Sequence, residues 1–125
     1  EHQVRTQALR LLGKRGTLRS LRMIQPFLSN PDYSERVAAL RSVAETRLWD
    51  GVPFFLNALT DQEPSIRYIA ASWLSLYAGQ GPTDVSILKA ENAPKVERQW
   101  REWWEANKSN HPSGTKVEIT VNPLK

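Results

Sequence analysis

The sequence predicts an all-α fold of repeated helix pairs, because three segments share one helical pattern at one spacing. Each segment carries an arginine, an alanine three positions later and an aliphatic residue four positions after the alanine. The three arginines, Arg5, Arg36 and Arg67, stand 31 residues apart. Constant self-spacing of this length is the signature of a repeat array, in which each unit buries its apolar face against its neighbours. A tryptophan-rich helix near the C-terminus is expected to cap the array.

Composition indicates one ordinary globular domain. The 125 residues are 40% hydrophobic and 24% charged, which is enough for one continuous core. The chain contains no cysteine, which excludes disulfides and thiolate metal sites. No apolar run is long enough for a membrane span. The net charge of +4 permits anionic partners without requiring them.

The repeat pattern predicts three units. They cover about residues 1–16, 17–47 and 48–79. The helices expected within them cover residues 2–13, 17–29, 32–46, 49–60 and 64–78. Pro26 should kink or shorten its helix, because proline cannot donate a backbone hydrogen bond. Gly13 and Gly16 are expected to bracket the first turn, and Gly51 the next. The first unit has only its second helix, so we expect a fragment of a longer array.

The last of these helices, at residues 64–78, is the most clearly amphipathic. Asp61 and Ser65 offer N-caps, and Pro64 suits a first helical turn. Its buried stripe is expected to be Ile66, Ile69, Ala70, Trp73 and Tyr77. The remaining sides are also mostly apolar, so this helix requires cover from two directions.

These features resemble HEAT repeats. The second helix of a HEAT unit begins with an aspartate, an apolar residue followed by arginine, and a small residue three positions after the arginine. Residues Asp61, Ile66, Arg67 and Ala70 match this pattern; Asn30 and Glu35 depart from it in the preceding unit. The resemblance covers residues 1–78 and implies an α-solenoid of about two and a half repeats, built of antiparallel helix pairs whose second helices line a concave side. It also implies a structural ladder between repeats, formed by Asp61, Arg5, Arg36 and Arg67.

Residues 94–108 predict a helix that caps the array and ends a domain at residues 1–109. Trp100, Trp103 and Trp104 share one face of this helix, with charged residues opposite. We expect them to form a capping core over residues 64–78. The alternative is an aromatic cage or a base-stacking platform. Trp49 lies at a turn and is expected to be partly exposed.

Residues 110–125 are expected to form a tail. Apolar and polar residues alternate over 116–121, which predicts a strand. A strand has no partner in a helical array, so it would be part of a free tail, begin another domain or pair with another chain.

The sequence shows no catalytic constellation. His2 and His111 lie near opposite ends, without a second ligand at metal-binding spacing. No nucleophile motif is present, and no glycine-rich phosphate loop precedes a helix. We therefore expect no enzymatic activity, no bound metal and no cofactor.

Positive charge gathers towards the N-terminus, and Arg10 and Arg41 stand at equivalent positions of the repeat; together these two observations predict the partner-binding residues. These are Arg10, Lys14, Arg15, Arg19, Arg22 and Arg41. We expect a non-enzymatic scaffold or protein–protein interaction segment of a larger protein, with another protein or a neighbouring domain as its partner. Two alternatives stay open: a nucleic-acid-binding module that uses the basic end, and an accessory helical domain of a larger enzyme.

Overall fold

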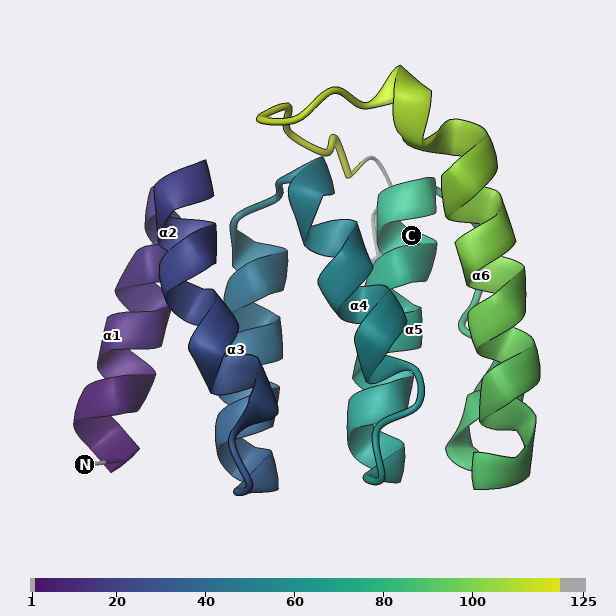
Figure 1. Ribbon diagram of the computed structural model, residues 1–125, viewed down its shortest axis with the longest axis horizontal. Helices are drawn as coiled ribbons and strands as arrows, with labels where there is room; N and C mark the ends of the chain where they lie inside the picture. The colour runs from purple at the N-terminus through teal and green to yellow at the C-terminus, as the bar shows by residue number, and fades with distance from the viewer. Residues whose placement is uncertain (1, 120–125) are drawn as a thin grey trace.

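The computed structural model describes residues 2–119, and these form helices and turns without a strand (Figure 1). The α-helices are α1 (His2–Arg15), α2 (Leu18–Ile24), α3 (Tyr33–Glu45), α4 (Val52–Ala58), α5 (Pro64–Ala78) and α6 (Ala93–Asn107). Short 3₁₀ segments are η1 (Gln25–Ser29), η2 (Trp49–Gly51), η3 (Val85–Leu88), η4 (Ala90–Asn92) and η5 (Lys108–Asn110). The prediction of an all-helical chain is confirmed for this part of the sequence. None of the described helices has the length and apolarity needed to cross a bilayer.

Helices α1 to α5 run in alternating directions. In Figure 1, α1, α3 and α5 run upward, whereas α2 and α4 run downward beside them. α1 packs on both α2 and α3, and α5 packs on both α3 and α4. The core therefore lies between a row formed by α1, α3 and α5 and the helices that return between them.

Local sequence explains where α2 begins and ends. The Thr17 hydroxyl accepts a hydrogen bond from the Ser20 amide at 3.0 Å, and the Ser20 hydroxyl accepts one from the Thr17 amide at 2.9 Å, which makes a capping box. The α-helix ends at Ile24 and continues as the 3₁₀ segment around Pro26. The expected effect of this proline is thus confirmed.

The prediction that Gly13 belongs to a turn is wrong. α1 continues through it to Arg15, and the turn that follows uses Gly16, whose φ of 60° suits glycine. A Cβ on Gly13 would lie 2.9 Å from the backbone oxygen of Ser42. Gly13 therefore allows the backbones of α1 and α3 to approach closely.

The N-cap of α5 also differs from expectation. Glu63 occupies that position without a side-chain cap bond, whereas Pro64 stands in the first turn as predicted. Asp61 instead accepts a hydrogen bond from the Glu63 amide at 2.9 Å, which shapes the turn before the helix. Gly79 ends α5 with a φ of 68°.

α6 does not cover α5 by itself. The nearest cover of α5 is η3, whose Ile87 is fully buried, and α6 packs on η3, η4 and α4. Trp100, Trp103 and Trp104 are half-buried and pack against the core. The far side of α5 is thus closed jointly by η3 and the tryptophan helix.

Trp49 is buried, contrary to the expectation of partial exposure. Only 8% of its surface is accessible. The His111 ring stacks on it with a centroid separation of 3.5 Å, and Tyr77 and Trp104 flank it at 5.7 and 6.2 Å. Its burial depends on His111, which lies far from Trp49 in the sequence.

Residues 111–119, termed here the C-terminal strap, return across the connection between α3 and α4 (Figure 1). The strand predicted over 116–121 does not form in its described part; residues 120 and 121 lie outside the described residues. Lys116 makes a single antiparallel bridge with Leu48, and the Val117 amide donates to the Arg47 carbonyl at 2.7 Å. The expectation that this stretch has no partner within the helical array was therefore wrong.

Candidate functional site

The predicted ladder residue Arg36 links α3 to the turn before α5. Its guanidinium donates to both carboxylate oxygens of Asp61, each at 3.0 Å, and to the Asn30 carbonyl at 2.9 Å. Both side chains of the pair are largely buried. The Asp61 carboxylate raises the pKa of Arg36 further above its ordinary value. Two parallel hydrogen bonds of this kind fix the relative position of the two side chains and pair their charges, so Arg36 has a structural role.

The other two ladder arginines also join neighbouring units, through different acceptors. Arg5 on α1 donates to both oxygens of Glu35 on α3, at 2.5 and 2.9 Å. Arg67 donates to the carbonyls of Ile87 and Leu88 in η3, at 2.9 and 2.7 Å. All three arginines therefore hold one segment of the array to another.

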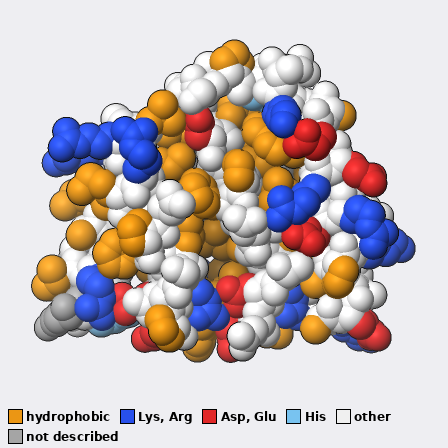
Figure 2. Space-filling view, viewed as in Figure 1, with side chains coloured by type: hydrophobic (Ala, Val, Ile, Leu, Met, Phe, Trp, Pro, Cys, Tyr) orange, Lys and Arg blue, Asp and Glu red, His pale blue; other side chains and the backbone are white. Residues whose placement is uncertain are grey.

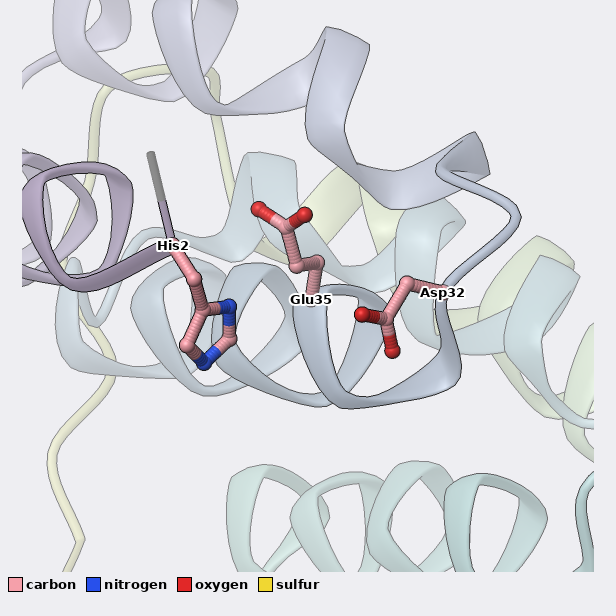
Figure 3. A group of neighbouring side chains, drawn as sticks. All are labelled: His2, Asp32 and Glu35. Carbon is pink, nitrogen blue, oxygen red and sulfur yellow. The ribbon is translucent and has the colours of Figure 1, made fainter.

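One cluster escaped the sequence analysis because its members are distant in sequence. His2 at the start of α1 lies beside Asp32 and Glu35 at the start of α3 (Figure 3). One ligand atom of each lies within 4.8 Å of the others. An imidazole and two carboxylates are donors of the type that hold zinc or similar divalent cations.

Existing hydrogen bonds occupy this cluster. Both oxygens of Glu35 already bind Arg5, and this contact lowers the pKa of Glu35. Asp32 accepts from the amide and hydroxyl of Ser34, at 3.0 and 2.8 Å, and these bonds lower its pKa. A divalent cation would have to displace the Arg5 guanidinium. The arrangement therefore favours an ion pair that joins α1 to α3.

The six predicted partner-binding residues are exposed, and none forms an ion pair within residues 2–119. Two of them lie at the end of α1 and two lie on the short helix α2, and we call this set of four the basic corner. Its members are Lys14, Arg15, Arg19 and Arg22. Figure 2 shows the corresponding group of basic side chains at the upper left. Exposed cations without internal partners are free to meet an anionic surface.

The remaining two, Arg10 and Arg41, lie together in a groove between α1 and α3. The groove has a volume of about 470 Å³. Its lining residues, which define the α1–α3 groove, are Thr6, Arg10, Ala38, Arg41, Ser42 and Glu45. The 31-residue step thus places two exposed arginines side by side, with one glutamate near them.

The tryptophans of α6 contact other aromatic rings. Trp100 and Trp103 meet edge to face at 5.4 Å, and Trp104 lies parallel to Trp49. Arg47 stands 4.9 Å over the Trp73 ring, a cation–π contact that spacing alone did not suggest. These contacts favour the capping core over a ligand cage.

Comparison with known proteins identifies one family. The model of the HEAT repeat matches residues 52–78, which comprise α4, α5 and the turn that carries Asp61. Residues 52–78 are therefore similar to a HEAT repeat. Searches of curated proteins and of solved structures gave no match. HEAT repeats are helical units that typically mediate protein interactions.

The HEAT repeat is joined to both flanking segments through one turn. The Asp61 side chain binds Arg36 from the preceding helix pair, and its carbonyl accepts from Arg67 at 2.8 Å. Arg67 then reaches η3 beyond the repeat. The Asp61 carboxylate therefore links this repeat to the preceding helix pair, and Arg67 links it to η3.

Proposed function

We propose that this chain is a non-enzymatic α-solenoid segment of about two and a half HEAT repeats that binds a protein partner. The proposed units cover residues 1–16, 17–47 and 48–79, with a capping helix at 94–108, in a domain of residues 1–109. Support comes from the alternating helices and from the arginine links between them. The interaction role follows the typical use of HEAT repeats.

The observation that carries the proposal is the pair of unpaired arginines in the α1–α3 groove. Arg10 and Arg41 come from two helices that pack directly on each other, so their separation is held by the core. Rigidly spaced cations select a partner whose acidic groups have matching spacing. We therefore place an acidic protein surface in this groove.

The test is a titration with an acidic peptide at low and physiological salt. An Arg10→Ala/Arg41→Ala variant should weaken binding, and salt should weaken it further because exposed charges are screened. The matched control is Lys95→Ala/Arg98→Ala, which removes the same charge from exposed positions on α6. Equal losses in both variants would contradict a defined groove.

Nucleic-acid binding is the second candidate, and the basic corner favours it. Four exposed cations on the end of α1 and on α2 form a positive surface of the kind that meets phosphates. Duplex DNA and single-stranded RNA are titrated in parallel. Tight, salt-sensitive binding that is lost in Arg15→Ala/Arg19→Ala/Arg22→Ala would replace the protein-binding proposal with this one.

A further inference from the structure

A pocket lies where η1, α3, α4 and α5 meet, between two helix pairs of the described array. Its volume of about 300 Å³ falls at the lower end of the range that ligand pockets occupy. In Figure 2, hydrophobic side chains line a hollow near the centre of the face, between α2 and α4. The apolar residues of this pocket, which we call the η1–α4 pocket, are Leu28, Leu40, Phe54, Ala58 and Ile66.

The walls of the η1–α4 pocket are held by the core. Leu40 and Ile66 are each only 1% exposed, so they belong to the interior as well as to the pocket. η1 packs chiefly on α3, and Ala58 contributes no more than a methyl group from α4. The hydrogen bonds between Arg36 and Asp61 join the two helix pairs on either side. The pocket is therefore formed before any ligand arrives.

Polar groups with spare donors also line the η1–α4 pocket. An arginine side chain carries five N–H donors. Arg36 makes four hydrogen bonds, two to Asp61 and one each to the carbonyls of Asn30 and Pro31, which leaves one Nη2–H without an acceptor among residues 2–119. Asn57 accepts from Arg101 through its side-chain oxygen, so its amide nitrogen is available.

The charge balance favours an uncharged ligand. Arg36 is the one charged side chain among the described residues that line the pocket, and the Asp61 carboxylate pairs with it. Burying a ligand charge here would cost free energy without supplying a new opposite charge. An apolar side chain beside an amide carbonyl fits both the apolar walls and the spare donors. An extended peptide offers this combination, because its backbone carbonyls are not already paired within a helix.

We propose that the η1–α4 pocket holds one apolar side chain from an extended segment of a protein partner, whose backbone carbonyls accept from Arg36 and Asn57. A protein occupant is favoured because the α4 and α5 residues of the pocket fall within residues 52–78, which match a HEAT repeat. The inference rests on the protein-binding role proposed above and uses different residues from those of the α1–α3 groove.

The probe is a short blocked peptide with one central leucine between glycines and serines. In its control, serine replaces the leucine. Binding is followed by NMR chemical-shift titration of the whole chain, and the leucine peptide should shift the amide signals of η1 and α4. The serine peptide should bind roughly tenfold more weakly or worse, because it forfeits the burial of an aliphatic side chain.

A first variant tests the location by filling the pocket. Ala58→Leu should abolish binding of the leucine peptide, because the added side chain occupies the same space. The matched control is Ala106→Leu, which adds the same bulk at an exposed position on α6 and should bind normally. Circular dichroism checks that both variants are folded.

A second variant keeps the test sound even if Ala58→Leu does not fold. Gln25→Ala/Asn57→Ala removes two exposed amides that line the pocket, and it should weaken binding roughly threefold to tenfold by the loss of hydrogen bonds. Gln80→Ala/Gln99→Ala removes two exposed amides elsewhere and should leave binding unchanged.

Several outcomes overturn the proposal. Equal binding of the leucine and serine peptides would show that the apolar walls are not recognised, and binding that survives both pocket variants would place the peptide elsewhere. Shifts at the pocket with toluene but not with the leucine peptide would assign it to a small apolar molecule, and self-association lost in Ala58→Leu would assign it to a second copy. If the acidic peptide binds through Arg10 and Arg41 and the leucine peptide does not bind, the proposed function stands and this inference fails. If neither peptide binds, both fail.

Discussion

The two ends of the helix row present the same face to different surroundings. At the N-terminal end, the α1 face of Val4, Ala8 and Leu11 is exposed. At the C-terminal end, α5 is covered by η3, with α6 packed over η3 and α4. Among the described residues, this face of α1 is therefore left open, whereas the apolar surface of α5 is covered by η3 and α6 together. The comparison teaches that closing an array takes dedicated sequence beyond the repeat itself.

At the C-terminal end of the helix row, the repeat arginine also binds a different kind of acceptor. Within the array, Arg36 binds the carboxylate of Asp61. Arg67 has Asn92 at the matching register position and instead donates to the carbonyls of Ile87 and Leu88. A short 3₁₀ segment can thus satisfy a buried arginine with backbone oxygens where the next repeat would supply a carboxylate.

The largest expected effect is a loss of folding stability when the aromatic cluster at the C-terminal end of the helix row is disrupted. Trp49→Ala should lower the free energy of unfolding by about 3–5 kcal/mol, because a buried aromatic is lost from a stacked cluster. Trp100→Ala should cost less, because Trp100 is half-buried. Glu102→Ala should change stability by less than about 0.5 kcal/mol, since Glu102 is exposed. Urea unfolding measures all three; a cost for Trp100→Ala above that for Trp49→Ala would mean that α6, rather than the strap, is the main closure.

A medium effect is expected where the C-terminal strap reaches back to the open end. The Lys116 ammonium donates to the Gly16 carbonyl after α1 and to the Thr46 carbonyl after α3. Lys116→Met should destabilise the fold by about 1–3 kcal/mol, because two carbonyls at helix ends lose a charged donor. Lys108→Met is the control, since Lys108 pairs only with the exposed Glu105. Equal, small losses of unfolding free energy would show that the strap does not clamp these helices.

Much of the fold was predictable because it depends on local pattern. The 31-residue step located the helix pairs, and Pro26 and Pro64 acted at the positions expected of them. Gly13 was misread because glycine ends helices more often than it permits a close crossing, and only the packing of α3 distinguishes the two roles. Trp49 was misread for a similar reason, since the ring that covers it belongs to His111.

The candidate site was predictable only in part. Repeat register placed Arg10 and Arg41 side by side, because one periodicity governs both helices. The meeting of His2 with Asp32 and Glu35 depends on how α1 crosses α3, which spacing along the chain does not encode. The exposure of Val4 and Leu11 on α1 follows only from which helices pack on α1.

The smallest expected effect is a pH dependence of folding stability that comes from His111 in the C-terminal strap. Burial against Trp49 lowers the pKa of His111 below its ordinary value of 6.5, so the folded state favours the neutral ring. The unfolded chain then binds more protons than the folded one between pH 6.5 and the folded pKa, and stability falls as pH drops through that window. Above it, His111 contributes no pH dependence. The lowered carboxyl pKa values of Asp32 and Glu35 act at more acidic pH, because that stabilisation is lost only as pH falls below about 4.5 towards their folded values.

Unfolding of the wild type and of His111→Phe is therefore compared at about pH 7.5 and about pH 5.5. The wild type should lose more stability than the variant between these conditions; identical slopes would mean that His111 titrates as freely in the folded protein as in the unfolded chain.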